Sequence, residues 1–126
     1  MTKMQKRNLK TKGEVDFDYK HDILFFKFSE REYNKSIEFE NLILDIDTRG
    51  FITGLQILEA SKFFNISKNA LLKIPRWELK TSVNNGVIEI RLIFNVEKRN
   101  KIIEKNPIIM QHTTEPLRNS QLVCVA

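Results

Sequence analysis

Apolar and polar side chains alternate along most of this chain, and the alternation predicts strands. It is present over residues 41–58, where Leu42, Leu44 and Ile46 share one face of the first segment. Period-two alternation is typical of a strand with one buried face. Residues 47–50, Asp-Thr-Arg-Gly, suit a hairpin turn, because Asp accepts a backbone N–H and Gly tolerates positive φ. We therefore expect a β-hairpin here, with Gly54 marking a bulge or a close approach by another element.

Three shorter alternating segments precede this hairpin, at residues 15–19, 23–28 and 36–40. A turn is predicted at 19–22 and a polar loop at 29–35. Together with the hairpin, these segments predict a five-stranded antiparallel meander.

The period changes after residue 58, which predicts a short helical connector in two pieces, 59–65 and 67–73. Ser67 suits the N-cap of the second piece and Pro75 ends it. Residues 76–83 and 88–96 then alternate around Asn84-Asn85-Gly86, a strong hairpin signal. Residues 97–105 read as a charged loop or frayed hairpin tip. Residues 108–110 and 122–125 are short strand candidates, which Pro107 and Pro116 restrict to edge or irregular positions.

The fold class expected from these elements is α+β: an antiparallel β-meander, a short helical connector and a second antiparallel β-hairpin region. The length of 126 residues fits one domain. We divide the chain into a basic flexible tail (1–13), a meander with its helix (14–74), and a hairpin region (75–126) packed against the meander as one domain.

The net charge of +5 is unevenly distributed. Residues 13–59 carry 5 basic and 11 acidic side chains, whereas residues 60–126 carry 11 basic and 5 acidic ones. The two halves are thus oppositely charged and could attract each other or another copy. The remaining charge lies in the tail, whose candidate phosphate contacts are Lys3, Lys6, Arg7, Lys10 and Lys12. No aromatic residue lies among them to stack on bases.

Two stretches carry a resemblance to a known family. Asp45-x-Asp47-x-x-Gly50, followed by Gly54-Leu-x-Ile-Leu-x-Ala-Ser61, and the upstream stretch from Phe17 to Ser29 resemble the domain of unknown function 2283 (DUF2283) over roughly residues 15–66. The resemblance implies a small β-rich module and supplies no catalytic residue. A regulatory or antitoxin-like role is a weak association of this resemblance.

No set of residues predicts an active site. Asp45 and Asp47 could hold Mg²⁺ or act as acid and base. The favoured interpretation is structural: Asp47 is a turn residue and Asp45 lies on the solvated face of the strand. The same applies to the pair Asp16 and Asp18. Ser61 lacks the flanking glycines of a nucleophile elbow. We expect His21 and His112 at the surface and Cys124 as a buried, inert thiol.

The aromatic residues 25, 26, 28, 63 and 64 are spaced for core packing rather than for a ligand pocket. Trp77 is the candidate interface anchor, together with the apolar strand residues Ile88, Ile90 and Leu92. A two-stranded hairpin this apolar cannot bury its face alone, so we expect either closure against the first sheet or a homodimer, and we favour the dimer.

The function remains unknown at this stage. We expect a small, non-enzymatic protein-interaction module that binds a protein partner or itself through sheet edges. The alternative is nucleic-acid binding through the basic N-terminal arm. No cofactor and no membrane span are expected, and a cytoplasmic location is the default for a chain with one cysteine and no signal-like segment.

Overall fold

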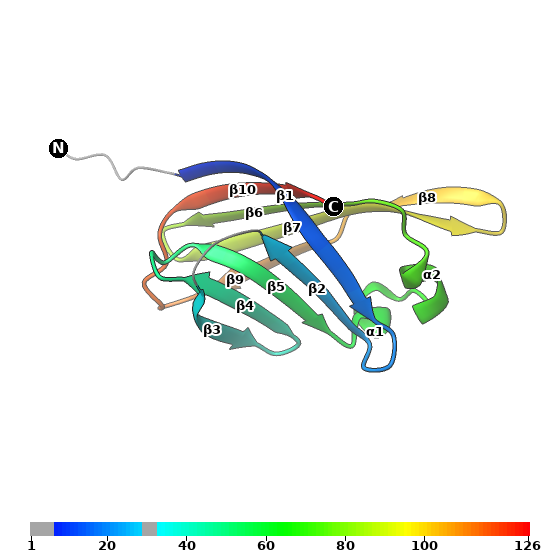
Figure 1. Ribbon diagram of the computed structural model, residues 1–126, viewed down its shortest axis with the longest axis horizontal. Helices are drawn as coiled ribbons and strands as arrows, with labels where there is room; N and C mark the ends of the chain where they lie inside the picture. The colour runs from blue at the N-terminus through cyan, green and yellow to red at the C-terminus, as the bar shows by residue number, and fades with distance from the viewer. Residues whose placement is uncertain (1–6, 29–32) are drawn as a thin grey trace.

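The computed structural model describes residues 7–28 and 33–126 and shows a mainly β protein with two short helices (Figure 1). The first half contains five strands and both helices: β1 (Arg7–Asp18), β2 (Ile23–Phe28), β3 (Tyr33–Phe39), β4 (Leu42–Asp47), β5 (Ile52–Leu58), α1 (Ala60–Phe64) and α2 (Lys68–Leu72). The second half contains five more strands: β6 (Trp77–Asn84), β7 (Val87–Lys98), β8 (Lys101–Lys105), β9 (Ile108–His112) and β10 (Ser120–Val125). The predicted α+β class is therefore correct only in outline, since helix is a minor component.

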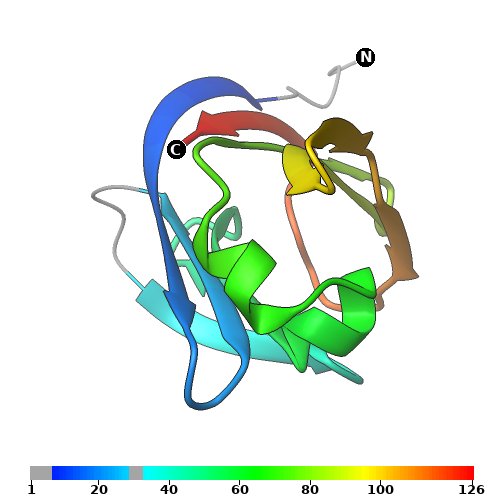
Figure 2. The same cartoon turned by 90° about the vertical axis from the view of Figure 1, so that its right-hand side faces the viewer.

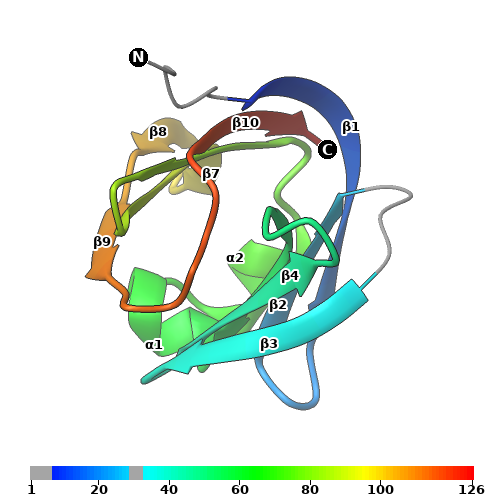
Figure 3. The same ribbon diagram turned by 90° about the vertical axis from the view of Figure 1, so that its left-hand side faces the viewer.

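The strands follow one path, β3-β4-β5-β2-β1-β10-β6-β7-β8, with β9 also paired to β7. Figures 2 and 3 show this path curving round a common interior, with α1 and α2 across one end of it. The buried side chains of both halves form one core. Closure of the two halves on each other thus buries the second hairpin inside the chain itself.

Strand β1 joins the two halves, and this corrects the predicted tail. Residues Arg7–Lys12 pair in parallel with β10, and Gly13–Asp18 pair antiparallel with β2. At the change of partner, a Cβ on Gly13 would overlap the sulfur of Cys124, so only glycine fits there. The tail prediction failed for residues 7–13 because parallel pairing with a distant strand leaves no local periodic signal. Residues 1–6 lie outside the described part of the chain.

The first half is not the simple meander that the alternation predicted. Strand β2 pairs with β5, with Leu24 opposite Ile57 and Phe26 opposite Leu55, rather than with β3. Strand β5 buries all of Ile52–Leu55, as expected for a strand between two neighbours and covered on both faces. Strand β3 starts at Tyr33, so the end of the predicted 29–35 loop is strand.

The predicted β4–β5 hairpin is confirmed, and so is its turn. Asp47 Oδ1 accepts from the amides of Arg49 and Phe51, each at 2.9 Å, and Gly50 has a φ of 86°. The register shifts beside Asp45, opposite Gly54, which confirms the expected irregularity. A side chain on Gly54 would come within 2.7 Å of the Asp45 carboxylate.

The second hairpin is also confirmed. The four buried residues of β6 lie opposite Phe94, Leu92, Ile90 and Ile88 of β7. Strands β8 and β9 both pair with β7 and act as one long edge strand, interrupted at Asn106 and Pro107. Strand β10 lies between β1 and β6, so its predicted edge position is wrong.

The helices follow the predicted pattern. The hydroxyl of Ser67 accepts from the Ala70 amide at 3.1 Å, which confirms the N-cap. Leu71 is buried, and Ile66, Ala70 and Ile74 pack against the core. Neither helix of the described residues is long and apolar enough to cross a membrane.

Candidate functional site

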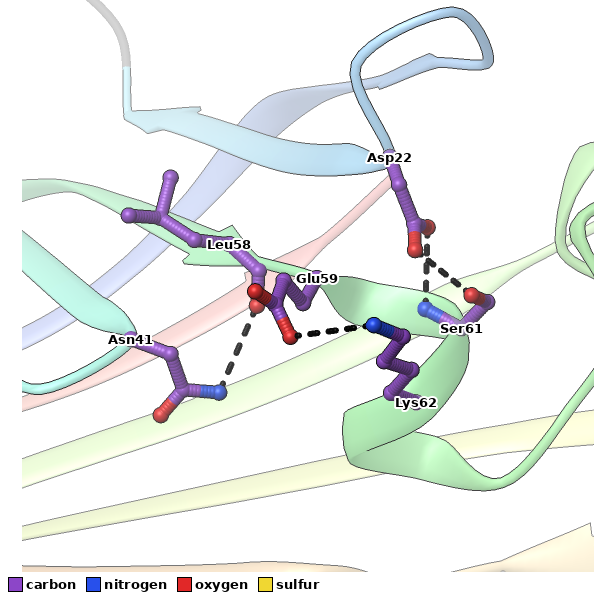
Figure 4. Close-up of polar contacts among 6 residues, drawn as sticks. All are labelled: Asp22, Asn41, Leu58, Glu59, Ser61 and Lys62. Atoms are coloured by element: carbon purple, nitrogen blue, oxygen red, sulfur yellow. Dashed lines mark hydrogen bonds and ion pairs between the residues drawn. The ribbon is translucent and has the colours of Figure 1, made fainter.

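The carboxylate of Asp22 connects the turn before β2 to the start of α1 (Figure 4). Its two oxygens accept from the Ser61 amide at 2.9 Å and the Ser61 hydroxyl at 2.5 Å, while its own carbonyl accepts from the Ala60 amide at 2.9 Å. Asp22 has a φ of 56°, so the turn before β2 is shaped to make these bonds. The contact caps the start of α1, whose own N-cap residue, Glu59, makes no side-chain cap.

This arrangement does not activate Ser61 as a nucleophile. A general base must reach the hydroxyl and be oriented by a third group. His21, next to Asp22, instead places its Nδ1 2.7 Å from Asp18, and this hydrogen bond lowers the pKa of the Asp18 carboxyl. Asp22 and Ser61 are therefore a structural clamp between two distant turns.

Asp45 and Asp47 take part in different hydrogen bonds. Asp47 is buried and accepts from two amides of its turn, whereas Asp45 accepts from the Ser36 hydroxyl of β3 at 2.8 Å. The two carboxylates therefore have different hydrogen-bond partners, one in the turn and one on β3. In residues 7–28 and 33–126, no group of three or more His, Cys, Asp or Glu could hold a metal ion. His21 and His112 are exposed, and burial raises the pKa of the Cys124 thiol, as expected for an inert cysteine.

The residues predicted as a dimer interface lie inside the core. Trp77 is 3% exposed and contacts Phe94, Phe26 and Phe64, with a centroid separation of 4.4 Å to Phe94. Ile88, Ile90 and Leu92 are fully buried. A second copy of the chain cannot reach these side chains, so the interface built on them is wrong. Trp77 instead packs against aromatic side chains of the same chain.

The predicted phosphate contacts are only partly described. The backbone of Arg7, Lys10 and Lys12 runs beside β10, whereas Lys3 and Lys6 lie outside the described residues. Arg7, Lys10 and Lys12 therefore belong to a paired strand rather than to a flexible tail.

A cavity lies between α2 and the hairpin formed by β7 and β8, and we call it the hairpin groove. It has a volume of about 690 Å³. Its lining combines apolar side chains, two cations and one acid: Ala70, Ile74, Pro75, Ile102, Lys73, Arg99, Glu97, Asn95 and Asn100. A volume of this size is within the range of ligand sites.

Sequence reasoning missed this groove, although a signal was present. Lys98, Arg99 and Lys101 sit around a two-residue turn, and Ile102 and Ile103 follow at once. The sequence predicts a charged loop or a frayed hairpin tip here, and the structure shows the hairpin of β7 and β8. A second cavity, of about 430 Å³, lies on β1, β2, β4 and β5 and is lined by Glu14, Asp16 and Asp45 among others.

Comparisons with known proteins support the family resemblance. The profile of the family described as "Protein of unknown function (DUF2283)" matches residues 14–61. A Methanosarcina mazei protein named "Putative hypoxanthine phosphoribosyltransferase" is 35% identical over 102 residues, which cover 81% of each chain. An uncharacterised Methanocaldococcus jannaschii protein is 27% identical over 113 residues, covering 89% of this chain and 97% of that one. No solved structure matches the chain. The match to the family profile and the 35% identity to the Methanosarcina mazei protein together show that the chain belongs to the DUF2283 family.

Proposed function

We propose that the protein is a small, non-enzymatic protein-interaction module. One observation carries the proposal: half of the eight exposed large apolar side chains in the described residues lie within residues 102–110. We call these four the apolar edge: Ile102, Ile103, Ile108 and Met110, which are 75%, 39%, 50% and 62% exposed. These side chains are spread along one edge of the sheet, and exposed apolar side chains of this kind offer a surface that another protein can cover.

Cavities on both parts of the apolar edge support this proposal. Ile102 lines the hairpin groove, and Met110 lines a cavity of about 230 Å³ beside Phe63. The edge therefore offers pockets for side chains. Lys101, Lys105 and Pro107 disfavour continuous strand addition along it, because charge and proline blunt a sheet edge. The proposed contact is thus mainly through side chains, and the partner is another protein or a second copy.

The matched experiment uses two variants of the full chain. Ile102→Ser with Met110→Ser removes two side chains of the apolar edge. Leu72→Ser with Tyr33→Ser removes two side chains that are 58% and 60% exposed elsewhere. After cross-linking in cells that express the native chain, we expect a partner on the wild type and on the control pair, and its loss from the edge pair. Equal capture by the edge pair, with unchanged unfolding temperatures, contradicts the proposal.

An enzymatic role is the competing proposal, because one relative carries an enzyme's name. The described residues offer Ser61 and Asp22 as their closest hydroxyl–carboxylate pair, and both groups are committed to capping α1. We expect no product when the purified chain is incubated with hypoxanthine and a phosphoribosyl donor. Turnover that disappears with Lys73→Ala, a residue of the hairpin groove, would overturn the non-enzymatic proposal.

Nucleic-acid binding is a second proposal with its own supporting observation. The strand that carries Arg7, Lys10 and Lys12 belongs to the same sheet as the cations of β7 and β8. Phosphate contacts would give an affinity that falls steeply with salt. A regulatory or antitoxin-like role in the cytoplasm is one form that the interaction module could take, and identifying the partner tests it.

A further inference from the structure

The cations of the hairpin groove lack acidic partners in the described chain. Lys73 and Arg99 line the groove, and Lys98 and Lys101 flank its turn. The ion pairs found in residues 7–28 and 33–126 involve other cations: His21, Lys35, Lys62, Lys80 and Arg91. Glu97 is the single acid in the groove lining. The groove therefore presents a net positive charge to whatever enters it.

The turn at the rim of the groove carries a residue that its geometry disfavours. Arg99 and Asn100 have φ values of 51° and 62°, so both adopt the left-handed conformation. Two-residue hairpin turns of this kind strongly prefer Asn-Gly or Asp-Gly, because other L-residues are strained there. An arginine at the first position is thus unfavourable for the turn, and such local strain is often retained for function.

The residues on either side of this turn are also unfavourable for stability, because both carry a positive charge. Lys98 and Lys101 lie directly opposite each other across the hairpin, and like charges in this arrangement are destabilising. Three cations are therefore held within four residues, although both the turn and the pairing would be more stable without them. Lys98 and Lys101 do not line the groove themselves, because the neighbouring pair that lines it, Glu97 and Ile102, lies on the other face of the hairpin; they add positive charge close to the groove.

The rest of the lining favours a peptide over a nucleic acid. No aromatic side chain lines the groove, so it offers no platform on which a base could stack. Its apolar part, Ile74, Pro75 and Ile102, instead suits an aliphatic side chain. Arginine pairs with a carboxylate through two parallel hydrogen bonds and is enriched at protein interfaces.

We propose that the hairpin groove binds an acidic peptide segment of the partner protein, one that alternates carboxylates with aliphatic side chains. Arg99 and Lys73 bind its carboxylates, and Ile74 and Ile102 contact its apolar side chains. This inference rests on the proposed interaction function and adds the chemistry of the partner.

The test measures binding of labelled twelve-residue peptides to the full chain by fluorescence anisotropy. The probes are an alternating Asp-Leu peptide, a matched Lys-Leu peptide and a twelve-nucleotide single-stranded DNA. We expect the Asp-Leu peptide to bind most tightly, with an affinity that falls as salt is raised. Arg99→Asn should weaken it about tenfold without lowering the unfolding temperature. Arg91→Asn, which changes an exposed cation of β7 outside the groove lining, should leave the affinity unchanged.

Each other outcome overturns this inference in a recognisable way. Equal binding of the Asp-Leu and Lys-Leu peptides excludes charge recognition, and tighter Arg99-dependent binding of DNA assigns the groove to phosphates. If Arg99→Asn does not change the affinity for the Asp-Leu peptide, the peptide binds at a site other than the hairpin groove. If the cross-linked partner is still lost from the variant of the apolar edge, the interaction function stands and only the acidic-peptide inference fails.

Discussion

The hairpin turns at the two ends of β7 differ in how well their residues suit the turn geometry and in how many outside hydrogen bonds they receive. At its start, the turn Asn85–Gly86 has residue types that tolerate the positive φ values of both positions. Residues outside the turn also hydrogen-bond to it. The Asn85 amide donates to Asn119 Oδ1 at 2.9 Å, and the Thr113 amide donates to the Gly86 carbonyl at 2.9 Å. At its other end, the turn Arg99–Asn100 has the same geometry with a disfavoured residue, and none of the described residues bonds to it from outside. The first end is organised for stability, whereas the second end keeps its charge at the expense of stability.

The burial of isoleucine side chains gives the largest expected difference between the two ends. Ile90 is fully buried, whereas Ile102 is 75% exposed. Ile90→Ala should lower the free energy of unfolding by roughly 2–5 kcal/mol, because it removes buried atoms and leaves a cavity. Ile102→Ala should change it by less than about 0.5 kcal/mol. Urea unfolding of both variants measures the difference, and similar losses would show that β8 is packed as tightly as the core.

A substitution in the first turn should have the next largest effect. Gly86→Ala places a side chain at a φ of 81°, with its Cβ only 2.9 Å from the Thr113 carbonyl oxygen. We expect a loss of about 2 kcal/mol in the free energy of unfolding. Gly50→Ala is the control, since Gly50 has a similar φ of 86° but its Cβ would meet its nearest atom at 3.5 Å. If the two losses are equal in thermal unfolding, the contact with Thr113 does not matter.

The sequence predicted one end of β7 better than the other, and the reason is physical. Alternation and the Asn-Asn-Gly signal placed β6 and most of β7, because burial of one face imposes a pattern on every second residue. The hairpin groove left no such pattern, since its lining comes from α2 and from an exposed turn. The pairing of β1 with β10 was missed for a related reason: parallel partners far apart in sequence share no turn. The interface assigned to Trp77 was wrong because hydrophobicity alone does not say which surface covers a strand.

Replacing the disfavoured residue should raise stability at the second end. Arg99→Asn gives this turn a residue that tolerates positive φ, and we expect a gain of about 0.5–1 kcal/mol in the free energy of unfolding. Asn85→Arg, the reciprocal change, should cause a loss at least as large, because it also removes the side chain beside Asn119. Differential scanning calorimetry of the two variants decides the point. A loss of stability with Arg99→Asn would show that the arginine stabilises its own turn, and the functional interpretation of its strain would then have no basis.

The smallest expected effect concerns the lysines that face each other beside this turn. Lys98→Glu converts the repulsion across from Lys101 into attraction, and a cross-strand pair of this kind contributes roughly 0.2–1 kcal/mol. Both side chains are exposed, so the gain should appear at low ionic strength and vanish near about 1 M salt, where the screening length is about 3 Å. Lys98→Gln is the matched control and should give about half of the gain, since it removes the repulsion without adding attraction. A gain that persists at high salt would come from strand propensity rather than from charge. In that case the cations around Arg99 would not oppose folding, and the difference between the two ends of β7 would reduce to the choice of turn residue alone.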